Sequence, residues 1–507
     1  MNDIAWYSKN PELLRSAASL PFAPVLGGQL FPSPLSTYRV PGIMKITYAY
    51  AFGPNEINTD QNHYPIALNQ SGKSIYSFLV HANSRNYSYE YQDLMMLIMA
   101  GAQVFSALSH CIRAYGIAKT YAENSVYKPG AYLSALGFDR DDFLDNLGEI
   151  WFDLNQLIAQ TQQIWIPNTL PIIQRWFWLN ANIFTDSEAG TSQSYMFVPK
   201  FFLQYNEVGL STGGSLEPAT FPVTTADGTT WQTMDTTPHK WAEWKALIQH
   251  MIDRLVNSED RGIIFGDILN AYGADKIYAM PSIPSDYRIE PVYNPEVLTQ
   301  IENLTCAGDA ALSGFDTPYS MYPVGLVQDP NGLQPRWHGG KASSNVAGGL
   351  PANPILNFHI ASQPTPENIM IATRLQAVGA IGQLGAYYKP AESVKTEDAT
   401  TITTIANTSS TTPLFIPQAV GTEIVIGVSL MRSNGNGGYT YRDVWPNVID
   451  TTSTEREGQA WVWLMPFDWH PFVYQLKYSN NSSGAIVVGD TASEVIAAFG
   501  DYDNYTT

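Results

Sequence analysis

The longest regular pattern of apolar positions in the chain lies within residues 89–123 and predicts a single long helix. Apolar side chains recur there at spacings of mostly three and four, as one helix face requires, at Leu94, Ile98, Phe105, Leu108, Ile112, Tyr115 and Ile117. Met95, Met96 and Met99 widen this face, so the start of the helix should be buried on nearly every side. Gly101 and Gly116 would either break the helix or let a neighbouring element approach closely.

Shorter patterns predict further elements before and after this helix. Alternating apolar residues indicate a strand over residues 42–50, and a helical block over 139–163 opens on acidic residues, which suit a helix N-terminus. Further helices are predicted over 239–257, 295–303 and 366–380. Strands dominate the last hundred residues, for example 423–430 and 460–464, and a glycine-rich turn at 434–438 separates two of them.

These elements predict a mainly α fold, α+β overall, in three parts. Residues 1–40 should form an N-terminal arm, because prolines recur there too often for a long helix. Residues 41–190, together with 441–507, should form a helical domain. Residues 191–440 should form a second domain of loops and strands, because the long apolar helices give way at about residue 185 to segments rich in Gly, Thr and Pro.

Composition narrows the possible functions. Apolar residues make up 45% of the 507 residues, which is enough for a substantial core, but only 14% are charged, against about 25% in an average soluble protein. We therefore expect other subunits to cover part of the surface. The formal net charge of −19 argues against a dedicated nucleic-acid binder and against a protein held by anionic lipid.

Few residues in the sequence suggest a disulfide, nucleotide, metal or catalytic site. Two cysteines, Cys111 and Cys306, exclude a disulfide scaffold, and no signal peptide is visible, so we expect an intracellular setting. Residues 72–74 (GKS) resemble the end of a phosphate-binding loop, but Ala67 stands where that loop requires glycine, so a polar turn is expected. The eight histidines show no metal-ligand spacing. The sequence predicts no enzyme, no cofactor and no metal site.

Aromatic residues are abundant instead, with 13 Trp, 29 Tyr and 21 Phe. Such residues are enriched in cores and at the centres of protein interfaces. The candidates for packing or interface contacts are Trp6, Tyr7, Phe22, Trp176, Trp178, Trp241 and Trp244.

Short blocks spread over nearly the whole chain carry a more specific signal. They are residues 2–7 (NDIAWY), 20–23, 89–100 (YEYQDLMMLIMA), 195–199, 262–267, 271–275, 371–375, 421–423 and 467–471. None is a motif with known chemistry, but in this order they resemble the capsid proteins of picobirnaviruses.

The resemblance implies a structural protein of the virion, assembled in the host cytoplasm. It implies a helical shell domain and a protruding domain, here residues 41–190 with 441–507 and residues 191–440. It further implies symmetric homodimers that build a small icosahedral shell around a double-stranded RNA genome. A host-cell membrane or receptor would be a further partner at entry.

Contact with that RNA is expected to be weak. Residues 1–130 contain 9 basic and 7 acidic side chains, a balance of +2, whereas the remainder contains 18 and 39, a balance of −21. Members of the family can carry a Lys/Arg-rich tail before the NDIAWY block, which begins here at Asn2. The candidate contacts are therefore the scattered cations of the first quarter: Lys9, Arg15, Arg39, Arg113, Lys119 and Lys128.

Two other classes share some of these features. A secreted acidic carbohydrate-binding or carbohydrate-active protein would also be rich in Trp and Tyr, but should have a signal peptide and a pair of carboxylates in an aromatic cleft. A receptor-binding or tail-fibre protein should show repeats or coiled-coil heptads, and neither is found.

Overall fold

The computed structural model describes residues 42–52, residues 67–305 with short gaps, and separate segments beyond residue 322. The longest of these later segments are 364–378, 418–445 with a gap at 434–438, and 467–471. The predicted arm at residues 1–40 and the predicted strand at 460–464 lie outside the described residues.

A five-stranded sheet joins distant parts of the chain. Its order is β15-β14-β1-β3-β2, with β1 (Ile43–Tyr50), β2 (Phe184–Thr185), β3 (Ser194–Pro199), β14 (Glu423–Ser433) and β15 (Tyr439–Trp445). The predicted first strand is thus confirmed and lies in the centre, antiparallel to β14 and parallel to β3. Burial of β1 on both faces explains its nearly continuous run of apolar residues.

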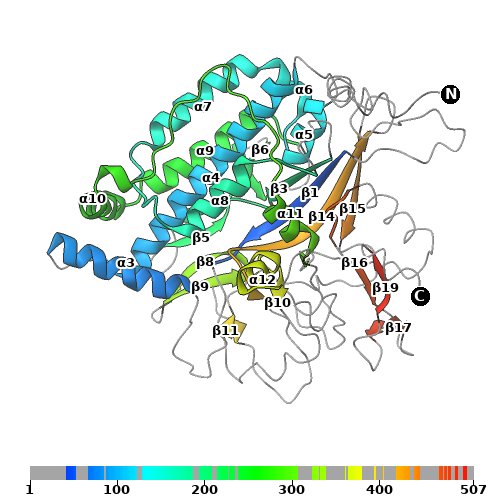
Figure 1. The fold of residues 1–507 in the computed structure, drawn as a ribbon. Helices are drawn as coiled ribbons and strands as arrows, with labels where there is room; N and C mark the ends of the chain where they lie inside the picture. Colours follow the sequence, from blue (N-terminus) through cyan, green and yellow to red (C-terminus); the bar gives the residue numbers. More distant parts are fainter. Residues whose placement is uncertain are drawn as a thin grey trace, which may run out of the picture.

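Helix α4 (Tyr91–Ala122) is the core of the fold, and it confirms the long helix predicted from the sequence. Met95, Met96, Leu97 and Ile98 are all buried, as their pattern requires. Helices α3 (Ala67–Asn83), α5 (Lys128–Leu136), α7 (Leu147–Thr161), α8 (Pro171–Ala181) and α9 (Trp241–Val256) pack around it. Figure 1 shows most of the helices gathered on one side of the sheet.

Glycines let neighbours approach α4 closely and do not break it. A Cβ added at Gly116 would lie only 3.2 Å from the backbone nitrogen of Ile289, and one at Gly101 only 2.8 Å from Ile166 Cγ2. Gly72 has the same role on α3, where an added Cβ would lie 2.6 Å from Met95 Cγ of α4. The polar turn expected at residues 72–74 is therefore wrong: these residues belong to α3 and pack it against the core.

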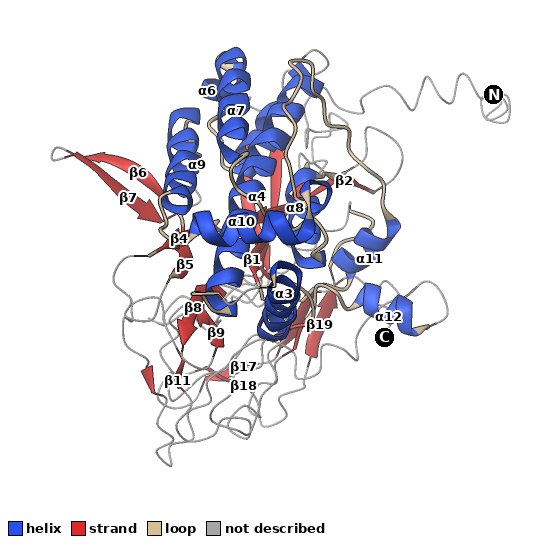
Figure 2. Cartoon of the chain, turned by 90° about the vertical axis from the view of Figure 1, so that its left-hand side faces the viewer, coloured by secondary structure: helices blue, strands red, loops and turns tan. Residues whose placement is uncertain are grey.

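The remaining elements surround this body. The helices are α6 (Arg140–Asp145), α10 (Arg261–Tyr272), η1 (Ala274–Lys276), α11 (Pro295–Glu302) and α12 (Pro366–Ala372). A four-stranded sheet contains β4 (Leu203–Asn206), β5 (Ser215–Pro218), β8 (Pro323–Asp329) and β9 (Gly332–Trp337). Figure 2 shows the hairpin of β6 (Thr220–Thr225) and β7 (Gly228–Thr233) projecting from the body.

Four further short strand pairs occur in the described segments beyond residue 376. They are β10 (Ala377–Val378) with β13 (Gln418–Ala419), β11 (Ser393–Val394) with β12 (Thr403–Thr404), β16 (Val473–Leu476) with β19 (Val495–Phe499), and β17 (Tyr478–Asn480) with β18 (Ile486–Val488).

Two predicted helices differ from the structure for physical reasons. The block at 139–163 divides at Asn146, whose side-chain amide donates to the carbonyl of Asp142 at 2.8 Å and so competes with the helical backbone. The helix predicted over 366–380 ends at Ala372, because the chain beyond it pairs as β10 with β13. The helices at 239–257 and 295–303 are confirmed within a few residues as α9 and α11.

The expected domain borders can be compared with this packing. The border at 190 falls between β2 and β3, and the border at 440 falls within β15, so both lie inside the five-stranded sheet. Helix α9 lies beyond residue 190 yet packs on α4 and α7. The described residues on both sides of residue 190 therefore share one core.

Helix α4 is also long and apolar enough to cross a membrane, with a mean hydropathy of 1.6 over its best window. All of that window is buried inside the protein. Its apolar character is thus accounted for by its place at the centre of the core.

Candidate functional site

The structure corrects one of the predicted RNA contacts, Arg113. This side chain is fully buried, and its guanidinium donates to the carbonyls of Leu179 and Asn182 at 3.1 Å and of Phe197 at 3.0 Å. The first two carbonyls lie at the C-terminal end of α8, where a cation is favoured by the helix dipole. Arg113 is therefore an internal link between α4, α8 and β3, and it has no surface to offer to a phosphate.

Burial fixes the charge state of the groups around Arg113. Burial lowers the pKa of Arg113 to about 10, so the guanidinium stays protonated at neutral pH. Burial, and then the charge of Arg113, lower the pKa of His110 well below its usual value. The imidazole is thus neutral, with Nε2 donating to the Leu136 carbonyl at 3.0 Å and Nδ1 accepting from Arg113 at 3.0 Å.

The other predicted cations are placed differently. The ammonium of Lys119 lies 5.7 Å from the centre of the Tyr115 ring near the end of α4, and Lys128 begins α5. Lys9, Arg15 and Arg39 lie outside the described residues. Arg113 is buried, so it and Lys119 do not form a basic patch on the surface.

The described tryptophan candidates pack mainly inside the subunit. Trp176, Trp241 and Trp244 are buried, and their indole nitrogens donate to the Thr422 carbonyl, the Asp153 carboxylate and the Gly137 carbonyl. Trp178 is partly buried against Phe184. Trp6, Tyr7 and Phe22 lie outside the described residues.

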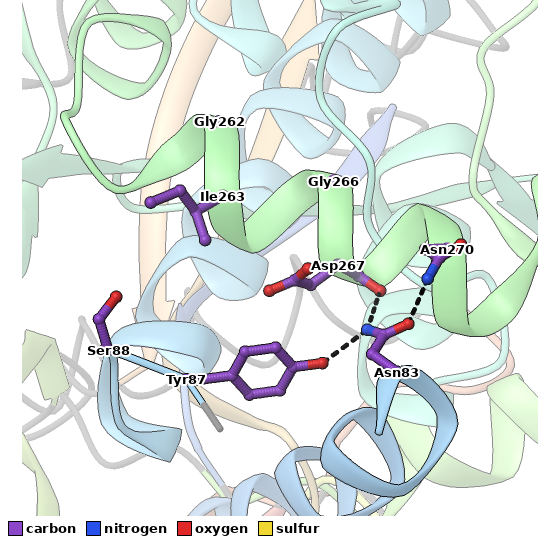
Figure 3. Close-up of a pocket in the computed structure, with 8 residues that line it drawn as sticks. All are labelled: Asn83, Tyr87, Ser88, Gly262, Ile263, Gly266, Asp267 and Asn270. Atoms are coloured by element: carbon purple, nitrogen blue, oxygen red, sulfur yellow. Dashed lines mark hydrogen bonds between the residues drawn. The ribbon is translucent and has the colours of Figure 1, made fainter. Parts of the chain in front are cut away.

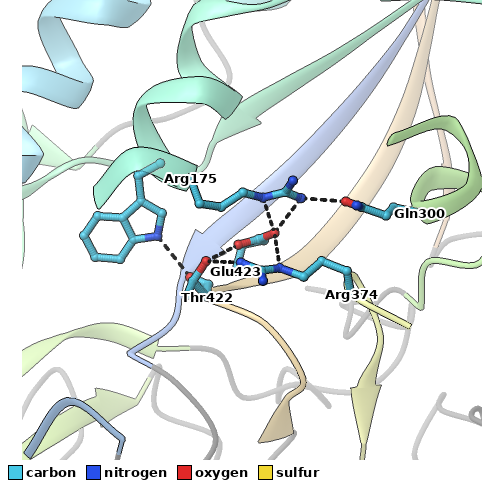
Figure 4. A network of polar contacts seen from close by, with 6 residues as sticks. Arg175, Gln300, Arg374, Thr422 and Glu423 are labelled. Atoms are coloured by element: carbon cyan, nitrogen blue, oxygen red, sulfur yellow. Dashed lines mark hydrogen bonds and ion pairs between the residues drawn. The ribbon is translucent and has the colours of Figure 1, made fainter. Parts of the chain in front are cut away.

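A buried carboxylate, Glu423, organises a network that links four distant segments (Figure 4). Arg175 of α8 donates to its Oε1 from two nitrogens at 2.8 and 2.9 Å, and Arg374 lies 3.7 Å away on the other side. Gln300 of α11 accepts from Arg175 at 2.8 Å, and Thr422 accepts from Arg374 at 3.1 Å. The network thus attaches α11 and the end of α12 to the sheet.

A second buried carboxylate, Asp186, ties the sheet to the 467–471 segment. It accepts from the hydroxyl of Tyr195 and from the backbone N–H of Asp468, while the Tyr195 oxygen accepts from the Trp469 N–H at 3.0 Å. Burial raises the pKa of Asp186 to about 7, and the nearby charge of Asp468 raises it too, against the lowering effect of the hydrogen bonds. The same burial lowers the pKa of the adjacent His470.

A groove of about 650 Å³ opens between α10 and the end of α3 (Figure 3). It is lined by Asn83, Tyr87, Ser88, Gly262, Ile263, Gly266, Asp267 and Asn270. Its polar groups bond one another: Asn83 donates to Tyr87 at 2.6 Å and to the Asp267 carbonyl at 3.2 Å, and it accepts from Asn270. These hydrogen bonds hold the end of α3 against α10 beside the groove.

Large apolar side chains are exposed at several places on the described surface. They are Phe78 on α3, Phe152 on α7, Ile263 on α10, Met370 on α12, and Val292, Tyr293 and Val420 in connecting segments. No group of three or more potential metal ligands occurs among the described residues. The features of the described surface that could contact a partner are therefore these exposed apolar side chains and the groove between α3 and α10.

The chain is similar to known capsid proteins in both sequence and fold. A family model for the capsid protein of picobirnaviruses matches residues 6–432. A curated capsid protein precursor of human picobirnavirus (strain Human/Thailand/Hy005102/-) is 26% identical over 332 residues, which are 62% of this chain and 57% of the relative. In that match the chain spans little more than half the relative's length.

A crystallographic structure of the picobirnavirus capsid has the same fold. It aligns over 98% of this chain and 93% of its own with a TM-score of 0.66, at 20% identity. Fold and sequence together place the chain among viral capsid proteins. It belongs to the picobirnavirus capsid protein family, which confirms the resemblance found in its sequence blocks.

Local spacing could not reveal the polar clusters, but the sequence blocks point to them. Residues 371–375 and 421–423 meet at Glu423, residues 195–199 and 467–471 meet at Asp186, and residues 262–267 line the groove. Blocks that are far apart in the chain thus come together at the same contacts.

The Glu423 network predicts a large loss of stability when its charge is removed. Glu423→Gln leaves two arginines without their buried counter-charge, which should lower the free energy of unfolding by about 3–5 kcal/mol in urea titration. Asp141→Asn is the control, because the Arg140–Asp141 pair is exposed and should contribute less than about 1 kcal/mol. Equal effects of the two substitutions would show that the Glu423 network does not hold the segments together.

The Asp186 contact predicts that mild acid stabilises this part of the fold. Its carboxyl titrates near 3.8 when unfolded and at about 7 when folded, so between these values the folded state holds a proton that the unfolded state has released. The contribution of Asp186 is complete below about pH 4 and is lost as the pH rises to 7. Asp186→Asn should remove this part of the pH dependence of the melting temperature, leaving the opposite effect of His470. Identical pH profiles for both proteins would contradict the assignment.

Proposed function

We propose that this chain forms the shell of a virion, as symmetric homodimers that assemble into a small icosahedral particle around a double-stranded RNA genome. The observation that carries the proposal is the family match over residues 6–432. The scarcity of charge supports it, because a surface consumed in contacts between subunits needs few charged groups. The alternative of a secreted carbohydrate-binding protein finds no support in these matches.

The packing suggests which part forms the shell. We infer that the body around α4, with the five-stranded sheet, is the shell domain, because residues 43–50, 194–199, 423–433 and 439–445 share its sheet. This assigns to the shell several segments that the sequence suggested for the protruding domain. The protruding domain would then be drawn from the parts of residues 191–440 that do not pack into this body.

The role is structural, and contact with the genome is weak. With Arg113 buried, the remaining cations proposed for RNA contact are Lys9, Arg15, Arg39, Lys119 and Lys128. Because these cations can neutralise only a few phosphates, binding should be weak, and little of it should remain at high salt. Assembly in the host cytoplasm and contact with a host membrane or receptor at entry belong to the same proposal.

Purified protein tests this function directly. Negative-stain microscopy and sedimentation should show dimers and closed particles, and those particles should contain little nuclease-protected RNA after a wash in high salt. A stable monomer at micromolar concentration would contradict the capsid function. Tightly held RNA that survives the wash would contradict weak attachment while leaving assembly intact.

A further inference from the structure

Residues 278–291 cross the body as an extended segment, which we call the strap. The strap lies in the connection from α10 to α11 (Figure 1) and forms neither a helix nor a strand. Two of its 14 side chains are buried, Ile283 and Ile289, whereas eight are exposed. A segment that buries so little apolar area contributes little to the stability of the fold and can open locally.

The first buried residue of the strap, Ile283, is held on α7 through its backbone. Asn155 accepts from the Ile283 N–H at 2.9 Å, and its amide nitrogen lies 3.3 Å from the Ile283 carbonyl oxygen, to which it donates. The indole nitrogen of Trp151, one turn earlier on α7, donates to the same carbonyl at 2.9 Å. A single polar side chain therefore binds both backbone groups of Ile283.

The second buried residue, Ile289, is held on α4 in the same way. The Thr120 hydroxyl accepts from the Ile289 N–H at 3.0 Å and lies 2.8 Å from the Ile289 carbonyl oxygen. Gly116 makes this close approach possible, since an added Cβ would lie 2.9 Å from the Tyr287 ring and 3.2 Å from the Ile289 nitrogen. The strap thus has two anchors, six residues apart, on two different helices.

Between the anchors the strap is mostly in contact with water. The Tyr115 hydroxyl donates to the Ser285 carbonyl at 2.7 Å, and Asp286 and Arg288 are exposed. These contacts join the strap mainly to side chains of α4 and α7, whereas the backbone hydrogen bonds of a helix are made within the helix itself. The strap can therefore leave its seat without breaking the hydrogen bonds inside either helix.

We propose that the strap detaches from α4 and α7 as one unit while both helices stay folded, and that a trypsin-like protease cuts the Arg288–Ile289 peptide bond only in this detached state. Arg288 is exposed, but Thr120 holds the nitrogen of the bond that follows it. The cut adds water across this bond and leaves a carboxylate on Arg288 and an amine on Ile289. Detachment also uncovers Tyr115 and Gly116, so the strap is a removable cover on the central helix.

Limited trypsin digestion of dissociated full-length protein tests whether the anchors open together. Asn155→Ala removes the anchor at Ile283, five residues before the cut, and should speed the appearance of the new N-terminus at Ile289 roughly tenfold or more in mass spectrometry. The reason is that cleavage follows the population of the detached strap, and a lost hydrogen-bond partner raises that population. Gln156→Ala is the matched control, because Gln156 is exposed on the same helix, and it should be cut at the unmodified rate.

A pair of glycine substitutions tests the seat on α4. Gly116→Ala places a methyl group under the strap, while alanine favours the helix more than glycine does, so the strap should detach and α4 should remain folded. Cleavage at Ile289 should again be faster. Gly148→Ala on α7 is the control, because a Cβ added there meets no atom within 4 Å.

Two results would overturn the proposal. If Asn155→Ala is cut at Ile289 as slowly as Gln156→Ala, the strap does not detach as a unit. If urea accelerates the cut as steeply as it promotes global unfolding, the helices open together with the strap. The proposal concerns a single subunit, so a failure of the unmodified chain to form particles would count against the proposed function and not against the strap.

Discussion

The enclosure of α4 on all sides is the constraint on which the rest of the fold depends. A helix of 32 residues with so little polar surface must be covered all round, and α3, α5, α7, α8, α9 and strands β4, β5 and β8 of the four-stranded sheet cover it. Its glycines allow that covering to be close, and its one arginine, Arg113, donates to carbonyl groups rather than to a carboxylate. Arg113 thereby makes the end of α8 and strand β3 part of the same unit as α4.

This unit is held together by contacts between residues that lie far apart in the chain. Strand β1 near one end of the described chain pairs with β14 across more than three hundred residues, and Glu423 at the start of β14 holds arginines from α8 and from the chain after α12. Asp186 fastens the 467–471 segment to the same sheet. Breaking either carboxylate contact would separate segments that lie far apart in the sequence, which is why this body cannot be divided at a single residue number.

The sequence predicted what depends on local periodicity and missed what depends on distant partners. Helix α4 and strand β1 follow from apolar spacing that their burial enforces. Helix α3 was missed because its first two turns are rich in Gln, Ser and Asn and contain a glycine, a composition that is also typical of turns. Arg113 resembled a solvated cation near a helix end, because its carbonyl partners lie 66 to 84 residues away. Glu423 and Arg175 are separated by 248 residues, so no local pattern could pair them.

Hydrogen–deuterium exchange on dissociated and assembled protein tests this account most directly. It predicts that the amides of α4 are strongly protected in both states, because that helix is interior to each subunit. Rapid exchange in α4 of the dissociated protein would contradict the central role of the buried helix.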